Sequence, residues 1–132
     1  LSPCVHSILA CRIGRTEKAC EMYLRTSRLD LDDYNNEVAE GLHITSMGGT
    51  WMSIVYGFGG MKIREGLLSF DPILPEKWEA LSFKIMFRGS TLNVSIEKRR
   101  VTIENLEGPE LKVYLRDSKL ELKSAGKLVR KS

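Results

Sequence analysis

Apolar residues in the first half of the chain recur at helical spacing. The first apolar face is made by Cys4, Val5, Ile8, Leu9 and Cys11. Their separation of three to four residues matches the 3.6-residue period of an α-helix. Gly14 follows where such a helix would stop, because glycine readily adopts the left-handed conformation that ends helices. The pattern predicts a first helix that ends just before Gly14.

Two further helices follow from the same period. Thr16 is placed to cap a second helix, whose apolar positions are Ala19, Cys20, Tyr23 and Leu24. Because only a few residues connect the first two helices, they should pack antiparallel. An irregular segment is expected over residues 29–42. The last helix is predicted from Ser46 to about residues 57–60, with an apolar face of Met47, Trp51, Ile54, Val55 and Phe58.

The second half of the chain changes to the period-2 alternation of β-strands. Apolar side chains alternate with polar ones over residues 82–88 and 92–97, and Arg88-Gly89-Ser90-Thr91 separates the two runs as a hairpin turn. Shorter strands are expected at residues 101–103, 111–115 and 119–122, followed by a frayed basic tail over residues 127–132. We therefore predict an α+β chain. Residues 1–60 form a helical part, and residues 61–132 form a small antiparallel β-sandwich-like domain.

Composition narrows the class of protein. The chain has 132 residues, 42% of them hydrophobic and 28% charged, and a net charge of +3. This charge is too small to indicate nucleic-acid binding, and no apolar run reaches the roughly 18 residues of a membrane span. The three cysteines, Cys4, Cys11 and Cys20, lack C-x-x-C spacing, which favours a reducing cytoplasm. The chain starts at Leu1 rather than at a methionine, and we expect a fragment of a longer protein.

The segment from Glu40 to Trp51 carries the candidate chemistry. It contains His43, one of two histidines, followed by Thr45 and Ser46 in the predicted N-cap position of the last helix, where their hydroxyls can accept a bond from a first-turn N–H. N–H groups of a first helical turn have no partner inside the helix, and the helix dipole favours an anion there. We expect unpaired N–H groups near Met47 to Gly49, where the glycines would let a ligand approach the backbone. Spacing alone leaves two interpretations open: an oxyanion or phosphate site, or a plain helix cap beside a structural histidine.

Other chemistries are less compatible with the sequence. The run Asp30-Leu-Asp32-Asp33 resembles the start of a calcium loop, but the glycine and glutamate that this loop requires are replaced by Asn35 and Gly41. The two histidines are far apart and have no thiol beside them, so we expect no metal site. Carboxylates such as Glu37 and Glu40 are expected to cap helices or to be solvated. Lys98-Arg99-Arg100 is expected to be a solvated turn between strands.

Several motifs together resemble glycoside hydrolase family 65. Residues 29–36 (Leu-Asp-Leu-Asp-Asp-Tyr-Asn-Asn), residues 41–47 (Gly-Leu-His-Ile-Thr-Ser-Met) and residues 49–51 (Gly-Thr-Trp) are similar to the end of that family's catalytic domain. Leu68-Ser-Phe70, Pro72, Leu74-Pro75, Trp78, residues 81–84 and Arg88-Gly89 are similar to its C-terminal β-domain. The resemblance covers nearly the whole chain, and the form His-Ile-Thr-Ser-Met is most similar to the members that act on maltose.

The resemblance implies both a fold and a reaction. Residues 1–60 would be the last helices of an (α/α)6 barrel, followed by the β-domain. The implied reaction is phosphorolysis of an α-linked disaccharide, most simply maltose, with inversion to β-glucose 1-phosphate and glucose. Phosphate would be a co-substrate, and no cofactor is expected. The site implied for phosphate comprises His43, Thr45 and Ser46 with the backbone of Met47 and Gly48. Phosphate is itself an anionic nucleophile, so it can replace the base of an inverting hydrolase.

The same resemblance places the general-acid glutamate upstream of Leu1, so the chain alone is expected to be inactive. Glu37-Val38 departs from the Asn/Thr-rich stretch that we associate with maltose-acting members. A carboxylate beside phosphate would repel it, so either Glu37 points away or the substrate differs. The alternatives are a hydrolase, a phosphorylase for another linkage (kojibiose, trehalose or nigerose), or a non-catalytic structural or sugar-binding module. Exposed helix faces such as that of Met47, Trp51 and Ile54 should cause dimerisation or other self-association.

Overall fold

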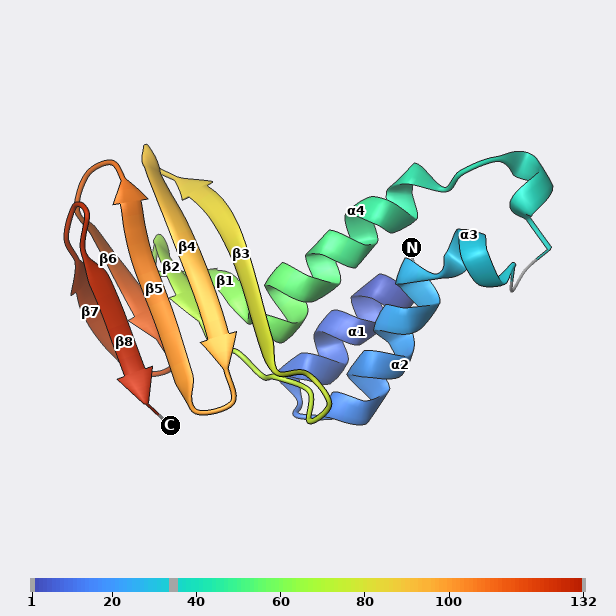
Figure 1. Ribbon diagram of the computed structural model, residues 1–132, viewed down its shortest axis with the longest axis horizontal. Helices are drawn as coiled ribbons and strands as arrows, with labels where there is room; N and C mark the ends of the chain where they lie inside the picture. Colours follow the sequence, from blue (N-terminus) through green and yellow to red (C-terminus); the bar gives the residue numbers. More distant parts are fainter. Residues whose placement is uncertain (1, 34–35, 132) are drawn as a thin grey trace. The chain divides into compact units, whose positions relative to one another are not determined.

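The computed structural model describes residues 2–33 and 36–131. The chain divides into two compact units, Leu1–Gly60 and Met61–Ser132. The first unit is helical and the second consists of β-strands (Figure 1). The α+β class predicted from the two hydrophobic periods is therefore confirmed.

The helical unit contains longer helices linked by short turns of helix. In chain order its elements are α1 (Ser2–Arg12), α2 (Thr16–Ser27), α3 (Leu29–Asp32), η1 (Val38–Glu40), α4 (Ile44–Met52) and the π-helix η2 (Ser53–Phe58). The prediction of an irregular segment over residues 29–42 was wrong in part, because α3 and η1 lie within it. Short helical turns of this length carry too few residues to show a hydrophobic period.

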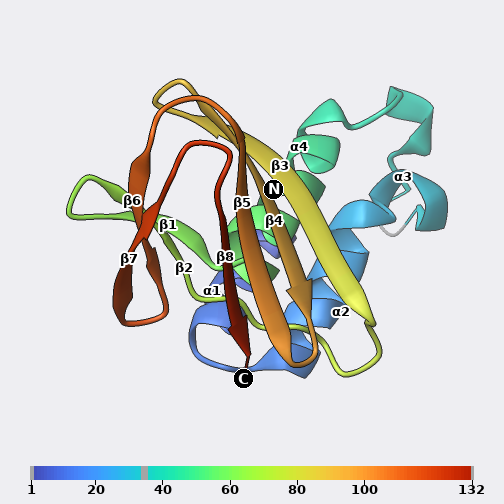
Figure 2. The same ribbon diagram turned by 60° about the vertical axis from the view of Figure 1, so that its left-hand side comes forward.

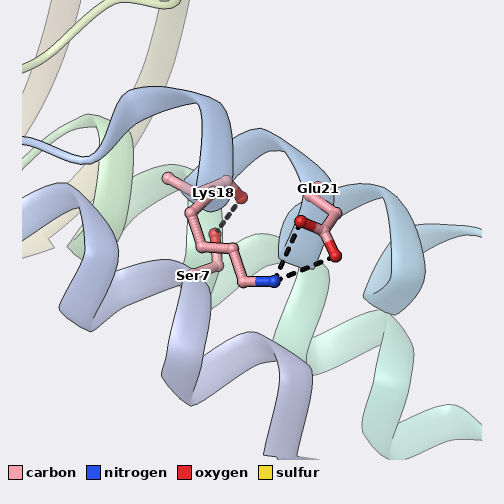
Figure 3. Close-up of polar contacts among 4 residues, drawn as sticks. Ser7, Lys18 and Glu21 are labelled. Carbon is pink, nitrogen blue, oxygen red and sulfur yellow. Dashed lines mark hydrogen bonds and ion pairs between the residues drawn. The ribbon is translucent and has the colours of Figure 1, made fainter.

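The turn between α1 and α2 has the glycine end that the sequence predicts. Gly14 has a φ of +74°, and its N–H donates to the Cys11 carbonyl at 3.1 Å. The Arg15 N–H donates to the Ala10 carbonyl at 2.8 Å, which completes the Schellman pattern of bonds at a helix end. Across the two helices the buried Ser7 hydroxyl donates to the Ala19 carbonyl at 2.9 Å (Figure 3). Lys18 and Glu21 pair on the exposed side of α2 in the same view.

The buried faces of α1 and α2 differ in part from those predicted. Cys4, Ile8 and Cys11 are buried as expected, but Val5 and Leu9 are about half exposed, at 47% and 49%. On α2 the core contains Ala19, Met22 and Thr26, whereas the predicted core residue Leu24 is 51% exposed. Thr16 is the first helical residue rather than a cap, and Arg15, which occupies the N-cap position, makes no cap bond with its side chain. The helix contacts of this unit therefore combine small residues with Ile8 and Met22, and several large apolar residues remain exposed.

The last helix begins earlier than predicted. α4 starts at Ile44, with His43 in the N-cap position, so the prediction of a cap at Thr45 or Ser46 was wrong. Val55 and Phe58 are buried as expected, and the Phe58 ring meets the Tyr23 ring edge-on with centroids 5.8 Å apart. Met47 and Trp51 belong to the predicted apolar face but remain about half exposed.

The β unit contains two four-stranded sheets, ordered β1-β2-β6-β7 and β3-β4-β5-β8 (Figures 1 and 2). The strands of the first sheet are β1 (Met61–Arg64), β2 (Leu67–Phe70), β6 (Leu111–Leu115) and β7 (Ser118–Leu122). Those of the second are β3 (Ala80–Phe87), β4 (Ser90–Glu97), β5 (Arg100–Glu107) and β8 (Lys127–Lys131). All neighbouring strands are antiparallel except β2 and β6, which are parallel, so the purely antiparallel prediction needs this correction.

The core of the β unit is built from alternating residues of both sheets. Along β4, every second residue is buried, including Leu92, Val94 and Ile96. The Phe70 ring of one sheet and the Phe83 ring of the other have centroids 6.4 Å apart. The two sheets thus share aromatic contacts in one core, as in a sandwich.

The turns and the tail complete this unit. Arg88 and Gly89 both have positive φ, +48° and +82°, so the predicted hairpin between β3 and β4 is a tight two-residue turn. Lys98 and Arg99 form the predicted turn before β5. The tail was wrongly predicted to be frayed, because β8 pairs along β5 over five residue pairs. This strand is rich in basic residues, and its alternation of apolar and polar side chains is too weak to indicate a strand from the sequence.

Candidate functional site

The candidate site lies where the segment after α3 returns to the start of α4. The carboxylate of Asp30 bonds His43 twice. Its Oδ2 accepts from the His43 backbone N–H at 3.0 Å, and its Oδ1 lies 2.5 Å from the ring Nδ1. The bond to the backbone satisfies an N–H at the start of the helix that has no helical partner. Asp30 therefore both caps α4 and fixes the orientation of the His43 ring.

The other ring nitrogen of His43 also faces a carboxylate. Nε2 lies 3.6 Å from Oε2 of Glu37, and the His43 side chain is only 24% exposed. The pKa of His43 is raised above its ordinary value. The first cause is the hydrogen bond to Asp30, partial desolvation opposes it, and the charges of Asp30, Glu37 and Glu40 add to it. The pKa of Asp30 is lowered in turn, chiefly by its two bonds from His43. The arrangement favours a charged imidazolium.

The backbone at the start of α4 is arranged differently from the prediction. The Ile44 N–H donates to the Leu42 carbonyl at 3.2 Å, and the Ser46 N–H donates to the His43 carbonyl at 2.9 Å. Because the helix begins at Ile44, Gly48 and Gly49 have carbonyl acceptors four residues earlier inside α4. The expectation of unpaired N–H groups is therefore wrong for these two glycines. An anion at this helix start would meet the exposed Thr45 and the dipole of the helix.

The two glycines of α4 have different surroundings. A Cβ on Gly48 would meet nothing within 4 Å, so open space lies over this position. A Cβ on Gly49 would lie 3.0 Å from Cys4 Cβ and 3.3 Å from Thr26 Cγ2. Gly49 thus serves the packing of α1, α2 and α4, and only Gly48 leaves its surface open to a ligand. Ser46 is buried, whereas Thr45 and Met47 are exposed.

The neighbouring acidic residues have structural partners. Asp32 accepts two bonds from the Arg28 guanidinium, both at 2.8 Å, which lowers the pKa of its carboxyl. Asp33 ends α3 with a φ of +47°. Tyr34 and Asn35, which belong to the family-like motif, lie outside the described residues. Within the described ranges 2–33 and 36–131, no three His, Cys, Asp or Glu side chains gather as a metal site.

Sequence reasoning located His43 but missed its partner. Asp30 lies thirteen residues before the histidine, in a segment that resembles the start of a calcium loop but lacks the residues that such a loop requires. A pairing at this separation leaves no periodic signal, since it depends on how α3 and the following segment turn back. The only available hint was an acidic segment shortly before a histidine at a helix start.

Comparison with known families matches both units. Residues 1–52 match the Glycosyl hydrolase family 65 central catalytic domain, and residues 61–122 match the Glycosyl hydrolase family 65, C-terminal domain. The chain belongs to glycoside hydrolase family 65. The resemblance expected from the motifs is confirmed, and the candidate site lies in the part that matches the central catalytic domain.

Individual family 65 proteins are similar over most of the chain. It is 50% identical over 111 residues to a maltose phosphorylase of Bacillus subtilis (strain 168), covering 84% of this chain and 15% of that protein. It is 45% identical over 122 residues to an alpha,alpha-trehalose phosphorylase of Thermoanaerobacter brockii, covering 92% of this chain and 16% of that protein. A solved structure described as a putative kojibiose phosphorylase from the human microbiome superposes with a TM-score of 0.91 at 40% identity, covering 100% of this chain and 17% of that one.

These family members are much longer than the chain, which spans about a sixth of their length. None of the three cysteines, all of which lie in the described part of the chain, forms a disulfide. Among the described residues, no helix is both long and apolar enough to cross a membrane.

Proposed function

We propose that this chain is the C-terminal part of an inverting disaccharide phosphorylase and that it supplies one side of the phosphate site. The observation that carries the proposal is His43 at the start of α4, where the bonds to Asp30 fix its ring and favour its charged form. An imidazolium beside a helix start offers a charge-assisted bond and a favourable dipole to a phosphate oxygen. The similarity to phosphorylases of the same family supports this chemistry.

In this proposal each residue has a distinct task. His43 donates to phosphate through its ring, and the exposed hydroxyl of Thr45 and the hydroxyl of Ser46 provide further polar contacts. Met47 and Gly48 line the site, and the open space over Gly48 lets phosphate approach the helix surface. Together they would hold phosphate in line with the anomeric carbon, so that positioning supplies part of the rate enhancement.

The general acid that protonates the leaving sugar is proposed to lie upstream of Leu1. Neither Glu37 nor Glu40 is assigned to that role. Glu37 forms an ion pair with His43, and Glu40 is exposed. We therefore propose that residues 1–60 complete an (α/α)6 barrel with upstream helices and that the 132-residue chain alone is inactive. The proposed location is a reducing cytoplasm, where cysteines such as these three, which form no disulfide among the described residues, are common.

Maltose is the proposed disaccharide, with β-glucose 1-phosphate and glucose as products. The 50% identity to a maltose phosphorylase supports this choice. The margin over a trehalose phosphorylase at 45% and a kojibiose phosphorylase at 40% is small, so these linkages are the second candidates. Activity of the longer protein on each disaccharide with phosphate separates them.

Replacing His43 in the longer protein that carries this chain tests the phosphate site. His43→Ala should raise the KM for phosphate by about 10-fold or more, since charge-assisted bonds are worth about 1.5–3 kcal/mol, and should change the KM for the disaccharide much less. His6→Ala is the matched control, because His6 lies exposed on α1. An unchanged phosphate KM in His43→Ala would show that His43 does not bind phosphate. Activity that does not depend on phosphate would favour a hydrolase.

A further inference from the structure

A second carboxylate, that of Glu37, lies beside the His43 ring and could affect phosphate binding. Asp30 occupies ring Nδ1, so Nε2 is the only ring atom left to donate to a ligand. The Glu37 carboxylate lies 3.6 Å from that atom. We propose that Glu37 is a built-in competitor that occupies Nε2 of His43 when phosphate is absent and must move away when phosphate binds. This inference rests on the proposed phosphate site.

The geometry of Glu37 suits a competitor better than a permanent partner. At 3.6 Å its carboxylate is an ion pair with His43 but is too far for a strong hydrogen bond, whereas Asp30 Oδ1 lies at 2.5 Å. Its side chain is 43% exposed, against 19% for Asp30. Exposed pairs of this kind are weak and exchange readily with other ions. Asp30 thus acts as the fixed partner and Glu37 as the one that can be displaced.

Charge leads to the same conclusion. Phosphate carries between one and two negative charges near neutral pH, and it cannot share Nε2 with a second anion without repulsion. Among the described residues, the charges of Asp30, Glu37 and Glu40 raise the pKa of His43. Within the same residues, Glu40 makes no ion pair within 4 Å. Glu37 is therefore the group in direct competition, and Glu40 acts only through its field.

Removing a competitor should strengthen phosphate binding, whereas removing a residue that binds phosphate would weaken it. Glu37→Gln should improve phosphate binding, because the amide has the same shape but no charge. The charge of Glu37 also supports protonation of His43, so the gain should be largest at a pH where His43 stays protonated without it. Asp30 remains in the variant and is the largest cause of that protonation.

The test is steady-state kinetics of the longer protein with inorganic phosphate as the varied substrate, at a pH of about 6, below the ordinary histidine pKa of about 6.5. Glu37→Gln should lower the KM for phosphate by about two- to five-fold, the factor that exposed charge pairs are typically worth. The KM for the disaccharide should stay within error. Glu40→Gln removes the same charge from the same segment and should change the phosphate KM by less.

The outcomes separate this inference from the proposed function. If His43→Ala weakens phosphate use while Glu37→Gln leaves the phosphate KM unchanged or raises it, the competitor is wrong and the phosphate site stands. If Glu40→Gln lowers the KM as much as Glu37→Gln, the effect is general charge rather than competition at Nε2, and the inference is also wrong. If the activity does not depend on phosphate, both proposals fail.

Discussion

Asp30 accepts a bond from the backbone of His43 and another from its ring, and so joins the start of α4 to α3 through one carboxylate. The same contact orients the imidazole and raises the pKa of His43. The most direct consequences of the contact concern how this histidine titrates and how much the contact adds to stability.

Replacing Asp30 should change both properties. Asp30→Asn keeps an acceptor oxygen but loses the charge, so the pKa of His43 should fall toward its ordinary value. The titration can be followed by NMR of the His43 imidazole. Asp32→Asn is the matched control, since it removes a neighbouring charge that pairs with Arg28 instead. An unchanged His43 titration in Asp30→Asn would contradict the pairing.

The pH dependence of stability follows from the same shifts. Because the pKa of His43 is raised on folding, its contribution is fully present below its unfolded pKa of about 6.5 and is lost as pH rises through the raised value. Because the pKa of Asp30 is lowered, its contribution is present above its unfolded pKa of about 3.9 and is lost as pH falls through the lowered value. The Tm difference between the natural chain and Asp30→Asn should therefore be largest between these limits. A difference that does not vary with pH would contradict this window.

Gly49 and Gly48 are adjacent in α4 but should respond oppositely to alanine. In Gly49→Ala the new Cβ would lie 3.0 Å from Cys4 Cβ, so Cys4 would have to shift by a few tenths of an ångström. Because Cys4 and Thr26 are both buried and have little room to shift, the free energy of unfolding should fall by about 1–2 kcal/mol. In Gly48→Ala the Cβ enters open space, and the higher helix propensity should add up to about 1 kcal/mol. Chemical denaturation of the two variants measures the difference. Equal effects at both positions would show that Gly49 is not a packing glycine.

The contrast between these glycines shows what the sequence could predict. Hydrophobic periods identified α1, α2, α4 and most strands, because each carries its own local pattern. The burial of Gly49 against Cys4 and Thr26 depends on how three helices meet, and no local pattern contains that information. The same limit hid the contact between Asp30 and His43. Short elements such as α3, and the basic strand β8, were missed because their residues are too few or too polar to show a period.

The hairpin between β3 and β4 allows a stabilising substitution. Arg88 has a φ of +48°, which is unfavourable for a residue with a long side chain, and Gly89 follows it with a φ of +82°. Asn is well tolerated in this conformation, and Asn-Gly is the preferred pair for such turns. Arg88→Asn should raise the free energy of unfolding by about 0.5–1 kcal/mol. Loss of the contact between the Arg88 guanidinium and the Phe87 ring reduces this gain. Lys98→Asn is the control, because Lys98 has no positive φ in its turn, and a similar gain there would contradict the backbone argument.

Self-association is expected because several apolar residues are exposed on the surface of the helical unit. Ile44, Met47 and Trp51 are spaced along one face of α4 and are 75%, 53% and 47% exposed. Apolar stripes of this kind tend to be covered by another surface, and a second copy of the chain offers one. Light scattering of the purified chain over a range of concentrations should show dimers or larger species. Ile44→Gln should shift the population toward monomer, whereas Met86→Gln, at a residue 80% exposed on β3, should not. A monodisperse monomer at high concentration would contradict the expectation, and an equal response to both substitutions would show that association does not involve the face of α4.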